Sequence, residues 1–497
     1  MYSKTKYHKN LRAIKRGGFD LAVTSIKLLM SEAPNTLPDI DTDQLIGLDH
    51  AQAEAIFNQG KEAVVFVLLQ LAKMAAEAKA VVQPSTPSGM IPVYLKQTVV
   101  GPKRKAGAQP GHKGSRRTAP ERIDHRREHR AEVCPDCGGP LNRCSETRTR
   151  YIEDIPEIKP EVTEHTIHRD WCPRCQKKVE APVADALPGS TIGLRTLSLS
   201  AWQHYALGNT LDQIVDVFNF HMQLKITPGG LVQMWYRLQE TLFPWYEQLH
   251  QEAMQSARLH ADETGWRVAG QTHWLWCFGN DRTTFYLIDR SRGSPALERF
   301  FTTFYEGTLI TDFWAAYNSV DCGSRQMCLV HLLRELSATT DYRNPGSDWP
   351  EFESLLGKLL RDSIEVWKER ETFAAGDLVL KRENFQSRLS AIIARTWTDS
   401  QILRLLKRLR RHEADLFTFL DKDAVPFDNN HAERSIRPAV ILRKNSYGNR
   451  SEQGSDCQAV LMSIFRTLRQ RGHDPIRTVI QAVSQQIKTG KLPPMPE

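Results

Sequence analysis

Three short acidic motifs in the second half of this 497-residue chain constrain its fold more than any other feature. They are Ala261-Asp262-Glu263-Thr264-Gly265, Ile310-Thr311-Asp312-Phe313-Trp314 and Asp428-Asn429-Asn430-His431-Ala432-Glu433-Arg434. Each motif places a carboxylate at the end of an apolar strand or at the start of a helix. Three carboxylates gathered from distant positions can bind two divalent cations, the arrangement that in-line phosphoryl transfer on DNA needs. The catalytic candidates are therefore Asp262, Asp312 and Glu433.

The elements predicted around the first two motifs follow the order of a ribonuclease-H-like fold. The sequence predicts a strand at 259–268, a hairpin formed by 273–278 and 283–288, a helix at 294–301, and strands at 308–311 and 326–330. In that fold the first and fourth strands are neighbours. We therefore expect Asp262 and Asp312 to meet at the edge of the sheet, within a multidomain α+β protein.

The third acid lies on a predicted helix. Asn429 or Asn430 can cap this helix, which carries Glu433 and is expected to end by Pro438. Helical periodicity puts Glu433 and Arg437 on one face. Glu433 could then reach a metal ion while Arg437 faces phosphate.

Other acids compete for the same roles. Asp289 and Asp321 occupy similar positions beside predicted strands, and Glu263 adjoins Asp262. Each carboxylate taken alone is more simply a surface residue at the end of a strand. The occurrence of three motifs together favours the functional interpretation.

Two Cys-x-x-Cys pairs precede the acidic motifs. Cys134 and Cys137 form the first pair, and Cys172 and Cys175 form the second, with thirty-four residues between the pairs. Two such pairs are the ligand set of a tetrahedral structural zinc site. A redox motif would need only one pair, in a βαβ setting that is absent. We predict a zinc ribbon.

Positive charge is concentrated before the first cysteine. The segment 96–130 has eleven Lys and Arg residues against three acids, a net of +8 that equals the net charge of the whole chain. Its Pro, Gly and Ser content excludes a regular helix or strand, so a flexible basic arm is predicted. Such an arm favours a polyanion, since each phosphate contact releases a counterion; a solvated linker is the alternative. The residues expected to contact DNA in the arm are Lys103, Arg104, Lys105, His112, Lys113, Arg116 and Arg117.

A helical region separates the cysteines from the first strand. A short helix at 211–218 is followed by a turn, after which Thr227 can cap and Pro228 can open a second helix. This pattern resembles a helix-turn-helix, which places a helix in the major groove. Two helices of an all-α connector are the alternative, because few basic residues lie nearby.

The hydropathy of the chain and the spacing of its motifs limit the class of protein and the number of domains. The longest apolar run, 64–69, is too short for a membrane span, and no signal peptide precedes it, so a cytoplasmic protein is expected. Asp312 and Glu433 are 121 positions apart, which exceeds what the fold needs and predicts an inserted helical subdomain. The predicted order is an N-terminal helical region (1–82), the basic arm (83–130), the zinc ribbon (131–188), the helix-turn-helix-like region (189–250), a catalytic domain (251–480) with the insertion at about 335–425, and a C-terminal tail (481–497).

These motifs together resemble the transposases of the insertion sequence 66 family, members of the DDE transposase superfamily. The shared pieces are Gly107-x-Gln-Pro-Gly-His-Lys-Gly114, the cysteine pairs with Cys-Gly-Gly, Ala-Asp262-Glu-Thr, Thr-Asp312-x-Trp-x-x-Tyr317 and Asp-Asn-Asn-x-x-Glu433-Arg434. The resemblance implies that Asp262, Asp312 and Glu433 form a catalytic triad that uses Mg²⁺ or Mn²⁺. Cys328-Leu-Val-His331 resembles a Cys-x-x-His element of several DDE groups, and an accessory site there is one interpretation; a core cysteine with a structural histidine is the other.

The family resemblance also implies an activity and partners. We expect metal-dependent strand cleavage and strand transfer on double-stranded DNA, at the terminal inverted repeats and at a target, by a homo-oligomer in the bacterial cytoplasm at the nucleoid. Arg434 and Arg437 are expected to contact this DNA. The sequence leaves open whether small accessory proteins take part.

Two other functions remain in contention at this point. The first is a catalytically inactive, transposase-derived DNA-binding regulator, against which the presence of all three acids speaks. The second is a structure-specific nuclease on the same fold, which would cut branched DNA without needing element ends.

Overall fold

The computed structural model describes residues 118–142, 146–342, 345–422 and 425–497, together with eight single positions between 54 and 67. The chain divides into two compact units, Met1–Thr98 and Val99–Glu497. Apart from those eight positions, the predicted N-terminal helical region lies outside the described residues. The seven arm residues from Lys103 to Arg117 that were expected to contact DNA lie outside them as well.

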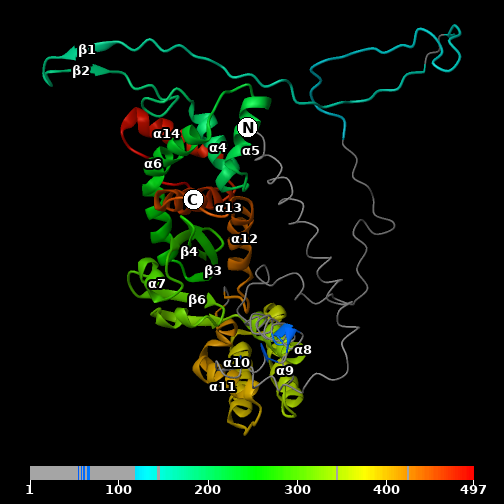
Figure 1. Cartoon of the computed structure of the whole chain (residues 1–497), viewed down its shortest axis with the longest axis vertical. Helices are drawn as coiled ribbons and strands as arrows, with labels where there is room; N and C mark the ends of the chain where they lie inside the picture. The colour runs from blue at the N-terminus through cyan, green and yellow to red at the C-terminus, as the bar shows by residue number, and fades with distance from the viewer. Residues whose placement is uncertain are drawn as a thin grey trace. The chain divides into compact units, whose positions relative to one another are not determined.

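A five-stranded mixed sheet forms the centre of the second unit (Figure 1). Its strands are β3 (Arg258–Val268), β4 (Gln271–Gly279), β5 (Thr284–Asp289), β6 (Tyr305–Thr311) and β7 (Cys322–Met327), in the order β5-β4-β3-β6-β7. β3, β4 and β5 are antiparallel, whereas β6 runs parallel to both β3 and β7. The first and fourth strands are neighbours, as predicted. The helix between β5 and β6 is α7 (Ser294–Phe300), with Pro295 in its first turn, also as predicted.

Alternate residues of β3 face two different cores. Leu259 and Ala261 belong to a large core shared with α4 (Leu194–Tyr205), α6 (Pro228–Met254), α13 (Glu452–Gln470) and α14 (Pro475–Thr489). Trp266 and Val268 belong to a smaller core shared with α12 (Asn430–Ser446). Successive side chains of a strand point to opposite faces. Asp262 therefore lies on the α12 side of the sheet, and Glu263 lies on the opposite side.

Helix α13 covers the free edge of β5. The backbone N–H of Thr284 donates to Thr467 Oγ1 at 3.0 Å, and that of Tyr286 donates to Ser463 Oγ at 2.9 Å. An uncovered edge strand would leave these donors open to pairing with another chain. The hydroxyl side chains of α13 thus complete the sheet on this side.

The region predicted to resemble a helix-turn-helix contains two helices, but their lengths differ from the expectation. α5 (Leu211–Asp216) ends earlier than predicted and continues as a π-helical turn, Val217–His221. α6 begins at Pro228 with Thr227 as its cap, as expected, yet it runs for 27 residues to Met254, past the predicted boundary at 250. Its apolar side packs against α13 and β5. Insertion of α6 into DNA stays a prediction.

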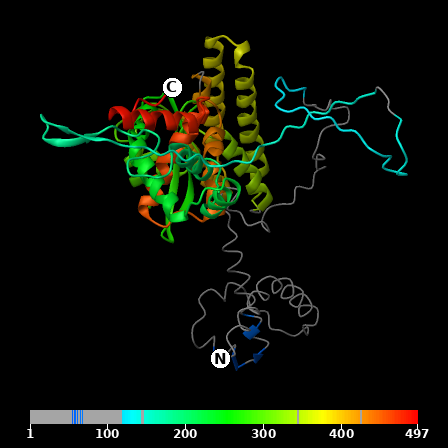
Figure 2. The ribbon, with the colours of Figure 1, turned by 90° about the horizontal axis from the view of Figure 1, so that it is seen from above.

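The long interval between the second and third motifs folds as helices with a core of their own. They are α8 (Leu329–Tyr342), α9 (Trp349–Lys368), α10 (Ala375–Ala394) and α11 (Ser400–Arg411), with short 3₁₀ turns at Arg370–Thr372, Glu413–Asp415 and Thr418–Leu420. Figure 2 shows α9 and α10 side by side in yellow. Leu356, Leu389 and Leu405 lie at the centre of this core. No helix in the described part of the chain is long and apolar enough to cross a membrane.

Two predicted elements have different boundaries in the structure. β7 begins four residues before the predicted 326–330 strand and ends at Met327. Cys328 N then donates to Thr311 O and Leu329 N to Phe427 O, which leads the chain into α8. α12 does not end by Pro438 but continues to Ser446. The proline removes one helical donor, but the helix is retained by packing against β3 and β4, and the Tyr286 hydroxyl donates to Ser435 O just before the proline.

Candidate active site

The parallel pairing of β3 with β6 brings two of the predicted acids together. The register runs from Arg258 opposite Thr308 to His260 opposite Ile310. Asp262 lies two residues farther along β3, and Asp312 lies two residues farther along the chain, just beyond β6. The charge of Asp312 raises the pKa of Asp262, so the two carboxylates lie close together. In a parallel pair, side chains in register lie on the same face. Asp312 directly follows the last residue of β6.

Electrostatic coupling connects all three predicted acids. Burial raises the pKa of Asp262 well above its ordinary value, and the negative charges of Glu263, Asp312 and Glu433 raise it further. Repulsion of this kind between carboxylates is relieved by a cation, which supplies the missing positive charge. The donor set, made only of carboxylate oxygens, has the chemistry that Mg²⁺ and Mn²⁺ prefer.

Glu433 has an arginine and a histidine of α8 as neighbours. It lies in the first turn of α12, and its Oε1 is 3.3 Å from Arg334 Nη1 and 3.6 Å from His331 Nε2. Cys328 is fully buried, whereas His331 is half-buried beside Glu433. The Cys-x-x-His element therefore divides into a core cysteine and a histidine that borders the candidate site. The sequence did not single out Arg334, which lies one helical turn after His331.

Asn429 ties the start of α12 to β3. Its Nδ2 donates to Ala261 O at 2.8 Å, and its Oδ1 is 3.0 Å from His260 Nδ1. Burial lowers the pKa of His260 to about 3, so the imidazole is neutral and its Nδ1–H donates to the amide oxygen. The side chain of Asn429 does not cap α12 as proposed; Asp428 instead accepts from the N–H of Asn430.

The rival acids have other environments. Asp289 Oδ2 is 2.6 Å from Arg299 Nη1, and its Oδ1 accepts from the N–H of Ser291. Asp321 is exposed. Glu263 is buried on the other side of the sheet from Asp262, where Tyr317 donates to it. None of the three shares the face of the sheet that Asp262 and Asp312 occupy.

The acids do not yet form a complete ligand set. Among the described residues, no three or more His, Cys, Asp or Glu side chains are arranged to hold a metal ion. Glu433 contacts Arg334 and His331 instead. Arg434 and Arg437, the DNA-contact candidates on α12, are exposed.

We expect the carboxylate cluster to destabilise the metal-free protein at high pH. Burial, with the charge of Asp312, raises the pKa of Glu263 from 4.5 to about 7, and the pKa of Asp262 is raised as well. The folded protein then binds more protons than the unfolded chain, so the free energy of unfolding falls as pH rises from about 5 to 8. Asp262→Asn should unfold at a higher temperature than wild type at pH 8, and the difference between the two proteins should be smaller at pH 5.

Thermal unfolding without added Mg²⁺ measures this effect. The exposed residue Asp321 provides the matched control, and Asp321→Asn should leave the pH profile unchanged. Equal unfolding temperatures for wild type and Asp262→Asn at pH 8 would show that the cluster carries no electrostatic strain.

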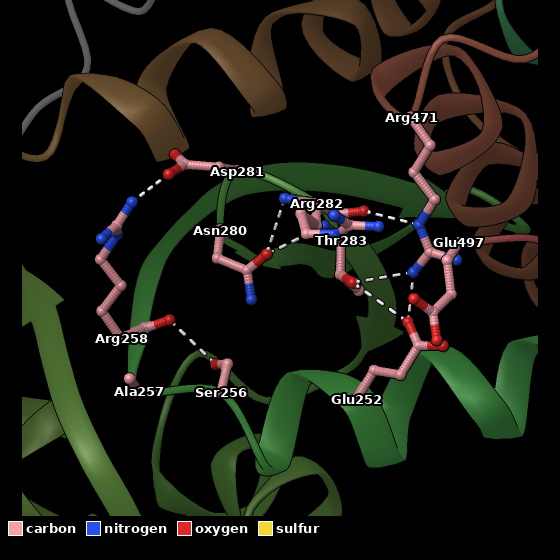
Figure 3. Close-up of a pocket in the computed structure, with 10 residues that line it drawn as sticks. All are labelled: Glu252, Ser256, Ala257, Arg258, Asn280, Asp281, Arg282, Thr283, Arg471 and Glu497. Atoms are coloured by element: carbon pink, nitrogen blue, oxygen red, sulfur yellow. Dashed lines mark hydrogen bonds and ion pairs between the residues drawn. The ribbon is translucent and has the colours of Figure 1, made fainter. Parts of the chain in front are cut away.

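A separate cavity of about 400 Å³ opens near the start of β3 (Figure 3). Arg258 pairs there with Asp281, and Arg471 pairs with Glu252. Arg282 also lines the cavity, but the carboxylates of Asp281 and Glu252 balance the other two guanidinium groups, so the lining carries little net positive charge for an anion. Asp262 lies four residues after Arg258 on β3, about 13 Å along the strand. None of the three candidate acids lines the cavity.

Both cysteine pairs have the local geometry of a zinc knuckle. Backbone N–H groups within each pair lower the pKa of its first thiol, Cys134 or Cys172. The residue after each pair has a positive φ, +70° at Gly138 and +49° at Gln176. A lowered thiol pKa favours the thiolate that binds zinc, so the donors fit the metal. The structure does not bring the two knuckles together among the described residues.

Comparison with known protein families identifies the family of this chain. A family model described as "Transposase IS66 family" matches residues 189–456, from before α4 to within α13. The chain belongs to this family. A second model, "zinc-finger binding domain of transposase IS66", matches residues 131–176 and so includes both knuckles of this IS66 family transposase.

Three curated relatives are similar in sequence to this chain, and each is described as uncharacterized. An uncharacterized protein of Sinorhizobium fredii, y4jD, is 25% identical over 70% of this chain and 73% of its own length. A second from the same organism, y4qI, is 26% identical over 46% of this chain and 47% of its own length. A third, y4hP, is 19% identical over 69% of this chain and 68% of its own length.

Proposed function

We propose that this IS66 family transposase cleaves and joins DNA with Asp262, Asp312 and Glu433 on a ribonuclease-H-like core. The observation that carries the proposal is the placement of Asp262 beside Asp312, with Glu433 on the helix that covers the same face. The strand order β5-β4-β3-β6-β7 supports the ribonuclease-H-like assignment. Phosphoryl transfer needs little covalent chemistry from the protein, so positioning and charge carry the catalysis.

Each of the three carboxylates would help to hold the divalent cations. Bound divalent cations would supply charge stabilisation for the attacking and leaving oxygens. The charges of both other acids raise the pKa of Asp262, which would therefore help to hold the cations together with each of them. Asp312 and Glu433 would each complete one of the two sites, and Glu433 would have to leave Arg334 and His331 to do so.

The DNA would be held by residues outside the triad. Arg434 and Arg437 are exposed on α12, one and four residues after Glu433, where phosphates could lie beside the acids. The basic arm would add affinity that is independent of sequence. The zinc domain, with Cys134, Cys137, Cys172 and Cys175 as ligands, and the α5–α6 pair would select the terminal inverted repeats.

Transposition in cells of a marked element with its native ends tests the proposal. Wild type should move the element and Asp312→Ala should not, while both bind the element ends equally. Movement by Asp312→Ala would refute the site assignment. If neither moves the element, cleavage of branched DNA without element ends would favour a structure-specific nuclease, and end binding without any cleavage would favour a DNA-binding regulator.

A further inference from the structure

A buried polar network lies on the face of β3 opposite Asp262. Glu263 is only 3% exposed, and it accepts from Tyr317 Oη at 2.7 Å and from Arg292 Nε at 3.1 Å. Tyr317 is 1% exposed. Each partner comes from a different segment: Glu263 from β3, Arg292 from the loop between β5 and α7, and Tyr317 from the 3₁₀ turn Ala315–Ser319 after β6.

Arg292 is held on both sides by aromatic rings. Its guanidinium carbon lies 4.4 Å from the centre of the Trp274 ring and 3.9 Å from that of Trp314. The Trp314 indole N–H donates to Arg292 O at 3.0 Å. A guanidinium stacked in this way has little freedom to rotate.

The same network reaches Asp312. Pairing of β3 with β6 stops at His260 and Ile310, so no ladder hydrogen bond joins Asp312 to β3. Asp312 Oδ1 instead accepts from the backbone N–H of Trp314 at 2.9 Å. The segment that carries Asp312 is therefore anchored through Trp314 to Arg292 and through Tyr317 to Glu263.

We infer that Glu263, Arg292 and Tyr317 are positioning residues that set the spacing between Asp262 and Asp312. This inference rests on the proposed function of those two acids. Glu263 adjoins Asp262 on β3, and its hydrogen bond from Tyr317 therefore connects the strand that carries Asp262 to the turn that follows Asp312. A buried charged network stabilises a fold little more than apolar packing does. Its contribution here is therefore to fix the positions of the segments that it joins.

Tyr317→Phe removes one hydroxyl and tests the inference in the zinc-loaded, full-length protein. We expect Mn²⁺ to bind about tenfold more weakly and end cleavage to slow by about 10–100-fold, the usual effect of losing a residue that orients metal ligands. Free Mn²⁺ is measured by electron paramagnetic resonance, which reports binding without activity. Glu263→Gln keeps an acceptor for Tyr317 and should retain more binding than Glu263→Leu.

Tyr305→Phe is the matched control. Tyr305 is fully buried on β6, and its hydroxyl donates to Ser256 O at 2.8 Å, away from the acids. Both tyrosine variants should lose similar thermal stability, but only Tyr317→Phe should lose Mn²⁺ affinity. Arg292→Lys, which keeps the charge without the stacked plane, should behave like Tyr317→Phe and provides a second test if that variant folds poorly.

Two sets of results overturn different claims. Mn²⁺ affinity and cleavage in Tyr317→Phe and Arg292→Lys equal to those of Tyr305→Phe would refute the positioning role alone. Unchanged Mn²⁺ affinity and cleavage in Asp262→Asn and Asp312→Ala would refute the proposed active site, and the positioning role with it.

Discussion

Asp262→Asn should reduce metal-dependent cleavage of the element ends by about 10³-fold or more. Metal-assisted stabilisation of transition-state charge contributes several kcal/mol, and each 1.4 kcal/mol corresponds to about tenfold in rate. Asparagine keeps the size of the side chain but lacks the charge that would bind the cation. Cleavage of a labelled DNA end by the purified protein, with Mg²⁺ or Mn²⁺, measures the loss.

The rival acid Asp289 provides the control for this prediction. It also ends an apolar strand, but it pairs with Arg299. Asp289→Asn should cleave DNA at a rate within about threefold of wild type. The substitution removes only the ion pair with Arg299, and such a pair contributes little to folding stability. A greater loss of cleavage in Asp289→Asn than in Asp262→Asn would move the active site to the opposite face of the sheet.

Cys172→Ser should remove zinc and abolish specific binding to element ends. Structural zinc contributes about 10–16 kcal/mol in small zinc domains, far more than the few contacts within 131–176 can replace. The three apolar cores of the sheet and its helices contain no residue of 131–176. We therefore expect the main thermal unfolding transition of Cys172→Ser to occur at the same temperature as that of wild type. Zinc content by atomic absorption and end binding by gel shift measure the two effects.

The half-buried residue Cys322 of β7 is the matched control for the zinc prediction. Cys322→Ser should retain one zinc per chain and normal end binding. Retention of zinc in Cys172→Ser would show that Cys172 is not a required zinc ligand. Loss of zinc with specific end binding retained would show that the zinc domain does not select the inverted repeats.

Local patterns predicted most elements of the sheet because they depend on neighbouring residues. Two apolar runs separated by a turn identified the β4–β5 hairpin, and Thr227 with Pro228 identified the start of α6. The same local rules failed at Pro438, where contacts of α12 with the sheet outweigh one lost hydrogen bond. They also failed to predict the length of α6, whose second half is retained by packing on α13.

The candidate site was predicted in part. The sequence singled out Asp262, Asp312 and Glu433, but it had no signal for Arg292 or Arg334, since isolated arginines are common. Asn429 was expected to cap a helix. Its partner His260 lies 169 residues away, and a contact over such a separation leaves no local pattern.

The sequence by itself determined the cysteine pairs, the acidic motifs and membership of the IS66 family, because each depends on residue types at short fixed spacings. Only the tertiary structure decided which acids lie together. Asp262 lies in a predicted strand and Asp289 directly follows one, and nothing local distinguishes them as catalytic candidates. The parallel pairing of β3 with β6 puts Asp262 beside Asp312, whereas Asp289 pairs with Arg299. The physical reason is that strand pairing joins segments far apart in the chain, and the burial of both faces of the sheet selects the register.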